Sequence, residues 1–346
     1  MSESIGPVDG FQRRHPVIGF PLAVIYKHFD DQGNYLAAII TYYTFIAIFP
    51  LMLMASSILG FFLQDNPDLQ ETLFNSVLSQ FPIIGDQLGR PEGLNGSTSA
   101  IVVGGVAALY GAMGLGQASQ NAINIAWSVP RNSRPNPFLL RLRSILLLAT
   151  AGLAVLVVAL LTTVASNSDA LGTDVGREVG WLIKAGSMVV LILVFTLLFR
   201  LASARQATWR STVPGAIAVA VMWQGLQWAG ATFVDRVITG ASQMNGVFAL
   251  VLGLIAFIYI AAVMAVLGVE LNVVFARKLY PRALLTPFTD NVSLTPADQR
   301  AYSYYAKAQR HKGFQSVQVT FEDREAKPAP PVESPPPERP RGSTRK

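Results

Sequence analysis

Four side-chain amides crowd into the eight residues QASQNAIN, at the end of a long apolar segment: Gln117, Gln120, Asn121 and Asn124. An amide without a hydrogen-bond partner is costly in lipid, so these side chains must face other helices or a wet cavity. Residues three and four positions apart share one face of a helix, so at least three of the four amides point the same way. The sequence therefore predicts either interhelical hydrogen bonds or one wall of a polar pathway.

Small residues precede the amides at every fourth position of the same segment. They are Ala100, Gly104, Ala108, Ala112 and Gly116, and Gln120 and Asn124 continue the line. Small side chains at this spacing let two helix backbones approach closely in a membrane. An interhelical hydrogen bond there contributes about 0.6 kcal/mol on average. The pattern favours a packing seam that ends in amide hydrogen bonds, with the polar pathway as the alternative.

An acidic residue interrupts the last apolar segment, in the stretch LGVELNVVFARK. Glu270, with Asn272 beside it, is a functional candidate because charged residues inside a span are costly. Arg277 follows roughly 10 Å further along a helix, so Glu270 is submerged but not central. Two interpretations stay open. Glu270 is either an ionisable contact for a substrate or the partner of an arginine near the same helix ends: Arg200, Arg205 or Arg210.

Two glutamines stand in another apolar segment, next to Trp223 and Trp228, where packing within a bundle is the favoured interpretation. The functional alternative joins all of these polar side chains into one cleft that opens to the cytoplasm. The candidate cleft contacts are Gln117, Gln120, Asn121, Asn124, Gln224, Gln227, Glu270 and Asn272.

The composition is that of a polytopic membrane protein. Of the 346 residues, 51% are hydrophobic and only 14% are charged, whereas an average soluble domain has about 25% charged residues. There is no cysteine, which excludes disulfides and cysteine-ligated metals. The three histidines (His15, His28 and His311) lie outside the apolar segments. We therefore expect no cofactor, no metal site and no enzyme activity.

Six segments are long and apolar enough to span a hydrocarbon core, which takes roughly 20 helical residues. They lie near residues 36–63, 99–126, 142–165, 179–201, 211–234 and 246–276. Lipid requires backbone groups to be satisfied internally, so the predicted fold class is an all-α membrane protein, a bundle of six transmembrane helices. Connections rich in Lys and Arg alternate with connections poor in them, which places both termini in the cytoplasm.

The regions outside the bundle differ in kind. Residues 1–35 are expected to be a cytoplasmic segment with an interfacial helix near 16–29, ahead of a transmembrane domain over 36–280. Residues 281–346 are expected to be a cytoplasmic, largely disordered tail, because they are polar and rich in proline. In the outer loop, apolar residues at helical spacing predict a short amphipathic helix over 67–81.

Several stretches resemble the YihY/BrkB family of bacterial inner-membrane proteins, once labelled ribonuclease BN. They are NYLAAIITYYTFIAIFPLML, the amide-rich end of the second span, WRSTVPGAIAVAVMWQGLQWA and GVFALVLGLIAFIYIAAVMAVLGVELN. The resemblance covers roughly residues 12–280. The chain departs from the family pattern at Ala47 and Ile48, where members carry a serine, and over residues 243–246. The resemblance implies six spans in the inner membrane and assigns no substrate.

The function that fits these observations is translocation of a lipid-like or small amphiphilic solute, with membrane lipids as partners. The alternative is a non-catalytic scaffold or envelope-integrity factor whose tail recruits partners. Ribonuclease activity is not expected, because the cytoplasmic loops offer almost no clustered carboxylates or histidines. Nucleic acid is not expected as a partner either, since arginines at span ends serve topology. The sequence leaves the oligomeric state open.

Overall fold

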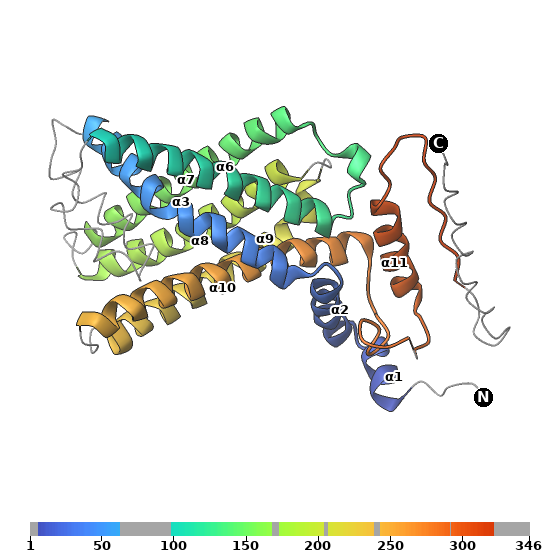
Figure 1. The fold of residues 1–346 in the computed structure, drawn as a ribbon. Coiled ribbons are helices and arrows are strands. Elements are labelled where there is room, and N and C mark those ends of the chain that lie inside the picture. The colour runs from blue at the N-terminus through green and yellow to red at the C-terminus, as the bar shows by residue number, and fades with distance from the viewer. Residues whose placement is uncertain are drawn as a thin grey trace, which may run out of the picture.

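The computed structural model describes residues 6–62, 98–167, 173–203, 207–238, 243–290 and 292–321, and within these ranges the chain is helical with no strand. The predicted all-α class is thus confirmed for the described residues. The long helices of the described residues lie side by side (Figure 1). They are α3 (Gly33–Phe62), α6 (Thr98–Ala126), α7 (Pro137–Asn167), α8 (Thr173–Ala202), α9 (Trp209–Phe233) and α10 (Gln243–Arg277). The helix expected over 67–81 lies outside the described residues.

Shorter elements complete the described chain, and three of them gather at the end of the bundle where α10 ends (Figure 1). These three are α1 (Pro7–Arg14), α2 (Pro16–Asp30) and α11 (Pro296–Ala308). Two single turns join long helices: η2 (Arg131–Ser133) precedes α7, and η4 (Val234–Ile238) follows α9 as a π-helical turn. The helix expected near 16–29 is therefore present as α2.

Four of the described helices contain stretches long and apolar enough to cross a membrane. These stretches are Pro137–Val158, Ala185–Ala202, Trp209–Arg236 and Phe248–Arg277. Helix α3 contains a shorter apolar stretch, Gly33–Ile48. Over their whole lengths α3 and α6 have 30 and 29 residues. The chain is thus an α-helical membrane protein, and the count of six spans stays a prediction.

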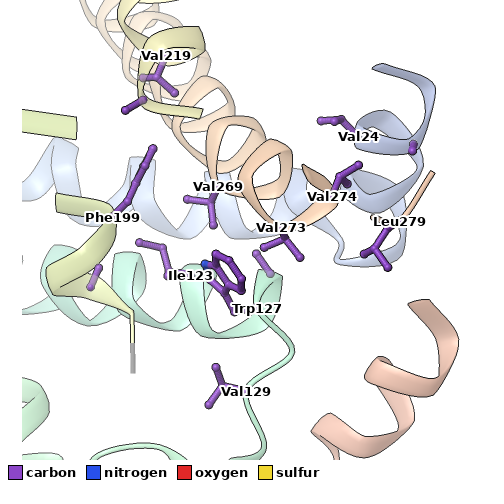
Figure 2. Close-up of a cluster of buried hydrophobic side chains, with 14 of the residues drawn as sticks. Val24, Ile123, Trp127, Val129, Phe199, Val219, Val269, Val273, Val274 and Leu279 are labelled. Carbon is purple, nitrogen blue, oxygen red and sulfur yellow. The ribbon is translucent and has the colours of Figure 1, made fainter. Parts of the chain in front are cut away.

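The largest apolar cluster of the described residues lies where α2, α6, α7, α8, α9, α10 and α11 meet. Figure 2 shows Trp127 of the α6 end beside Val269 and Val273 of α10, with Phe199 of α8 and Val24 of α2 in the same cluster. Val273 is fully buried. Because the cluster draws side chains from seven helices, this core fixes the ends of α6 and α10 against each other and against α2.

Helices α9 and α10 approach each other closely at two glycines, Gly215 and Gly268. A Cβ atom at Gly215 would collide with the backbone oxygen of Gly268, and one at Gly268 would lie 3.1 Å from the backbone oxygen of Gly215. Asn272 bridges the same contact, since its Oδ1 accepts a hydrogen bond of 2.7 Å from the backbone N–H of Gly215. Close backbone approach through small residues is a recurrent way to pack helices in membranes.

Candidate functional site

The amides at the end of α6 serve first as a joint between helices. Gln120 is buried, and its amide nitrogen donates to Ser144 Oγ (2.9 Å) and to the backbone oxygen of Leu140 (3.0 Å), both in α7. One turn earlier, a Cβ atom at Gly116 would collide with Ser144. Gly116 and Gln120 thus form the close contact and the hydrogen bonds expected of a packing seam.

The remaining sequence-predicted residues divide among different surroundings. Asn124 and Asn272 are buried, whereas Gln117, Asn121 and Gln224 are exposed and Gln227 is partly buried. Asn121 Oδ1 accepts a hydrogen bond of 2.9 Å from Arg134. Apolar residues next to Asn124 on α6 and next to Glu270 on α10 belong to the same cluster. In contrast, Gln120 forms a hydrogen bond to α7, and Asn272 forms a hydrogen bond to α9. These described contacts do not join the eight residues into one polar wall.

Glu270 is fully buried and is paired with a histidine from outside its helix. Its Oε2 lies 2.9 Å from His28 Nδ1 of α2, and His28 Nε2 lies 3.1 Å from Asn34 Oδ1 of α3. The structure therefore pairs Glu270 with His28 and not with either described arginine of the expected set. Arg200 instead donates to the backbone oxygen of Ala207 and packs over Trp209, and Arg205 lies outside the described residues.

A second buried ion pair lies one residue away on α2. Lys27 Nζ contacts Asp31 Oδ2 at 2.8 Å, and both side chains are 1% exposed. The same ammonium lies 3.3 Å from the Tyr305 hydroxyl and 4.9 Å from the centre of that ring. Tyr305 belongs to α11, so Lys27 holds the C-terminal helix against α2.

A third buried group centres on Arg282, in the segment between α10 and α11. Its guanidinium pairs with Asp298 of α11 and lies 3.1 Å from Asp30 Oδ2 of α2. Asp298 also accepts hydrogen bonds of 2.9 Å from the backbone N–H groups of Ala283 and Thr295. Thr295 and Asp298 form a capping box at the start of α11. The additional bond from Ala283 to Asp298 fixes this helix to the segment before it.

Together these side chains form one charged cluster, which we call the polar junction. Its members are Lys27, His28, Asp30, Asp31, Glu270, Arg282, Asp298 and Tyr305. It contains four carboxyl groups against two permanent cations, so a protonated His28 improves its charge balance. The junction connects α2, α10 and α11 at one end of the bundle (Figure 1).

The junction shifts the titration of its members outside the spans. Burial alone would lower the pKa of His28, but the hydrogen bond and negative charge of Glu270 raise that pKa above its ordinary value. Burial raises the pKa of Asp31, against the opposing effect of Lys27. Burial likewise raises the pKa of Tyr305 well above its ordinary value, and the charge of Asp31 adds to it. His28 is thus held toward its charged form by its contact with Glu270.

We expect the stability contributed by His28 to depend on pH. A raised folded-state pKa means that the contribution is complete below the ordinary value of 6.5 and is lost as pH rises through the folded-state value. The wild-type unfolding midpoint should therefore exceed that of His28→Gln most in acid, and the excess should shrink with rising pH. Thermal unfolding of both proteins from pH 5.5 to pH 9 measures it, with His15→Gln as a control for loss of an exposed imidazole. An excess that is constant with pH would contradict the expectation.

An apolar cavity of about 330 Å³ lies in the bundle. Side chains from α3, α6, α8, α9 and α10 line it, among them Thr44, Trp223, Phe257 and Ala265. None of the eight residues singled out in the sequence lines this cavity. Leu36 of α3 and Val266 of α10 are buried together between the cavity-lining part of α10 and Glu270. The cavity and the buried Glu270 thus lie along the same helix, α10, and the contact between Leu36 and Val266 separates them.

Sequence reasoning missed most of the polar junction. His28, Asp31, Arg282 and Asp298 stand in segments that look like ordinary charged flanks, and Asp298 belongs to the stretch assigned to a largely disordered tail. One local signal was available: Thr295 and Asp298 stand three residues apart around Pro296, the spacing of a helix N-terminus. No group of three or more metal-binding side chains is arranged for a metal ion in the described ranges.

The comparisons with known proteins complete this picture. No curated protein and no solved structure matches the chain. A family model described as "Virulence factor BrkB" matches residues 24–290, which is more than half of the chain and includes every long helix. The match also includes residues 24–30 of α2 and the segment that carries Arg282, so the members of the polar junction outside α11 fall within it. The resemblance seen in the sequence is confirmed, and this chain is a membrane protein of the BrkB family.

Proposed function

We propose that the chain crosses the bacterial inner membrane six times, with both termini in the cytoplasm. Contacts at one end of the bundle support an even number of crossings. Lys27 and Asp30 precede the long helices in the chain, and they contact Tyr305 and Arg282, which follow these helices. Both flanking segments therefore lie at the same end of the bundle. The α6–α7 connection lies at the same end, where the Asn132 backbone N–H donates to the Arg310 oxygen. These are the basic segments, so the positive-inside rule favours the cytoplasm for this end.

For this bundle we propose translocation of a lipid-like or small amphiphilic solute. The observation that carries the proposal is the placement of an apolar cavity and a buried carboxylate on the same helix, α10. Ala262 lines the cavity, and Val266 and Glu270 follow it at four-residue steps, so the three share one helix face. An amphiphile has an apolar and a polar part, and this face offers surroundings for both. A carboxylate inside a span favours a functional role because charge there is costly.

The test is lipid and solute flux in liposomes that contain the purified protein. We expect transbilayer movement of a fluorescent phospholipid to exceed that in protein-free vesicles. Glu270→Gln removes the charge that holds His28, so we expect about a tenfold lower rate, equivalent to about 1.4 kcal/mol of barrier. Asp290→Asn makes the same chemical change at an exposed acidic residue and should keep the wild-type rate. Absence of flux above protein-free vesicles for phospholipids and for small amphiphiles would remove the support for translocation.

The scaffold alternative is separated from translocation by removing residues 322–346. The start of α11 is attached to the bundle through Arg282 and Asp298. A tail that recruits partners would therefore follow a helix that is held at the end of the bundle. Translocation by the bundle predicts unchanged liposome flux after the deletion. A scaffold predicts no flux in either protein and loss of partner-dependent behaviour in cells after the deletion.

A further inference from the structure

Three small side chains of one helix form part of the wall of the cavity in the bundle. Ala261, Ala262 and Ala265 of α10 line the cavity. Across from them, α3 contributes Ile40, Thr44 and Ile48, which follow each other at four-residue steps and so lie on one helix face. Interiors of proteins are ordinarily filled to the density of organic crystals. The alanines therefore leave a space that an occupant of the right shape can fill.

The chemistry of the lining favours a hydrocarbon occupant over water. Thr44 is the one hydroxyl residue of the lining, and its Oγ1 already donates to the backbone oxygen of Ile40 at 2.8 Å. An ordered water needs about two to four polar partners, and this lining does not offer them. Trp223 and Phe257 close part of the wall as an edge-to-face pair with ring centres 6.0 Å apart. Burial of methylene groups in this cavity is favourable, whereas the lining offers no compensating interaction to a charged ligand.

The size of the cavity fits a single chain. Small-molecule sites have volumes of roughly 300–1,000 Å³, and this cavity, at about 330 Å³, is at the lower end of that range. The space is too small for a whole phospholipid with two chains and a headgroup, but it suits a slender apolar segment. Three of the helices that line it, α8, α9 and α10, contain stretches of membrane-spanning length and composition, so hydrocarbon chains are the most abundant apolar molecules around the bundle.

We propose that this cavity binds one hydrocarbon chain of a lipid or a free fatty acid. The inference rests on the proposed function, because it assigns to the cavity the apolar part of the translocated amphiphile. The polar part then lies toward Glu270 and His28, beyond the contact between Leu36 and Val266. The chain makes apolar contacts alone, so the site selects by chain length and shape and not by hydrogen bonding.

Tryptophan fluorescence tests the proposal, because Trp223 lines the cavity and bromine atoms quench tryptophan on contact. The probes are 9,10-dibromostearate and a phosphatidylcholine with dibrominated chains, added to the purified full-length protein in detergent micelles. We expect saturable quenching that disappears in Trp223→Phe. Ala265→Leu fills the cavity and should weaken the apparent affinity at least tenfold, or abolish the saturable component. Saturation by the phospholipid assigns the chain to a lipid, and saturation by the fatty acid alone assigns it to a free acid.

A matched control separates cavity filling from a general effect of larger side chains. Ala256→Leu makes the same substitution on the same helix at an exposed position, and it should retain saturable quenching. Ala261→Leu is a second filling variant if Ala265→Leu does not yield folded protein. Quenching that rises in proportion to the bromolipid content and is unchanged in Trp223→Phe would overturn the proposal. Flux without saturable quenching overturns this inference alone, whereas saturable quenching without flux overturns translocation and leaves the chain site standing.

Discussion

Asp298→Ala is expected to detach α11 and the segment before it from the end of the bundle. The Asp298 carboxylate is fully buried, pairs with Arg282 and accepts two backbone N–H groups. Its removal leaves a buried guanidinium with Asp30 as the remaining carboxylate partner. Breaking a buried pair by removing one partner costs about 3–5 kcal/mol. We expect a lower unfolding midpoint and loss of hydrogen-exchange protection over Pro296–Ala308.

Two further variants make this expectation specific. Asp290→Ala removes an exposed acidic residue from the same connecting segment and should leave the midpoint nearly unchanged. Arg282→Met combined with Asp298→Ala removes both members of the pair, so its effect should be smaller than the sum of the single effects. If Asp298→Ala unfolds at the same midpoint as Asp290→Ala, the buried pair does not hold α11.

Gly215→Leu is expected to prevent the packing of α9 on α10. Even the first atom of a side chain at Gly215 would collide with the backbone oxygen of Gly268, and the next neighbours belong to the Asn272 amide. A backbone atom cannot rotate away as a side chain can, so the helices must separate and the Asn272 bond must break. Overpacking typically costs about 1–3 kcal/mol, which we expect for Gly215→Ala. For the larger leucine we expect loss of folded protein, measured as the monodisperse fraction in size-exclusion chromatography and as the unfolding midpoint.

The same helix offers a control that points in the opposite direction. Gly225 of α9 is exposed, and a Cβ atom added there would have no neighbouring atom within 4 Å. Gly225→Ala should therefore be neutral or raise stability by roughly 0.5–1 kcal/mol, since glycine is unfavourable inside helices. Equal losses in Gly215→Ala and Gly225→Ala would show that contact between the two backbones does not set the effect.

The contrast between Gln120 and Glu270 shows how far the sequence reaches into the candidate site. The line of small residues before Gln120 predicts a packing seam, and the structure places Gly116 and Gln120 against Ser144 of α7. That prediction rests on spacing within one helix, which is a local property. The partner of Glu270 stands 242 positions away, on a short helix outside the long apolar segments. No pattern near Glu270 distinguishes His28 from the arginines that also lie near helix ends.

The C-terminal segment contains a helix that its polar composition does not predict. Residues 281–346 are expected from their composition to be a largely disordered tail, yet residues 296–308 form α11. Composition arguments count the apolar surface that a segment can bury, and this segment has little. Its polar groups are instead buried with partners: Arg282 with Asp298 and Asp30, and Tyr305 with Lys27. Each partner offsets part of the cost of burying the other, which would be larger for a charge buried alone.

The sequence by itself determined the class of this protein, its family and the positions of its long helices. These follow from hydrophobic runs, loop charges and short motifs, and each can be seen within a few tens of residues. Tertiary structure alone decided that His28 pairs with Glu270, that α11 is folded against α2, and that the space beside Ala265 is apolar. The reason is physical: hydrophobicity acts locally along the chain, whereas a hydrogen-bond partner or a cavity exists only once distant helices have packed together.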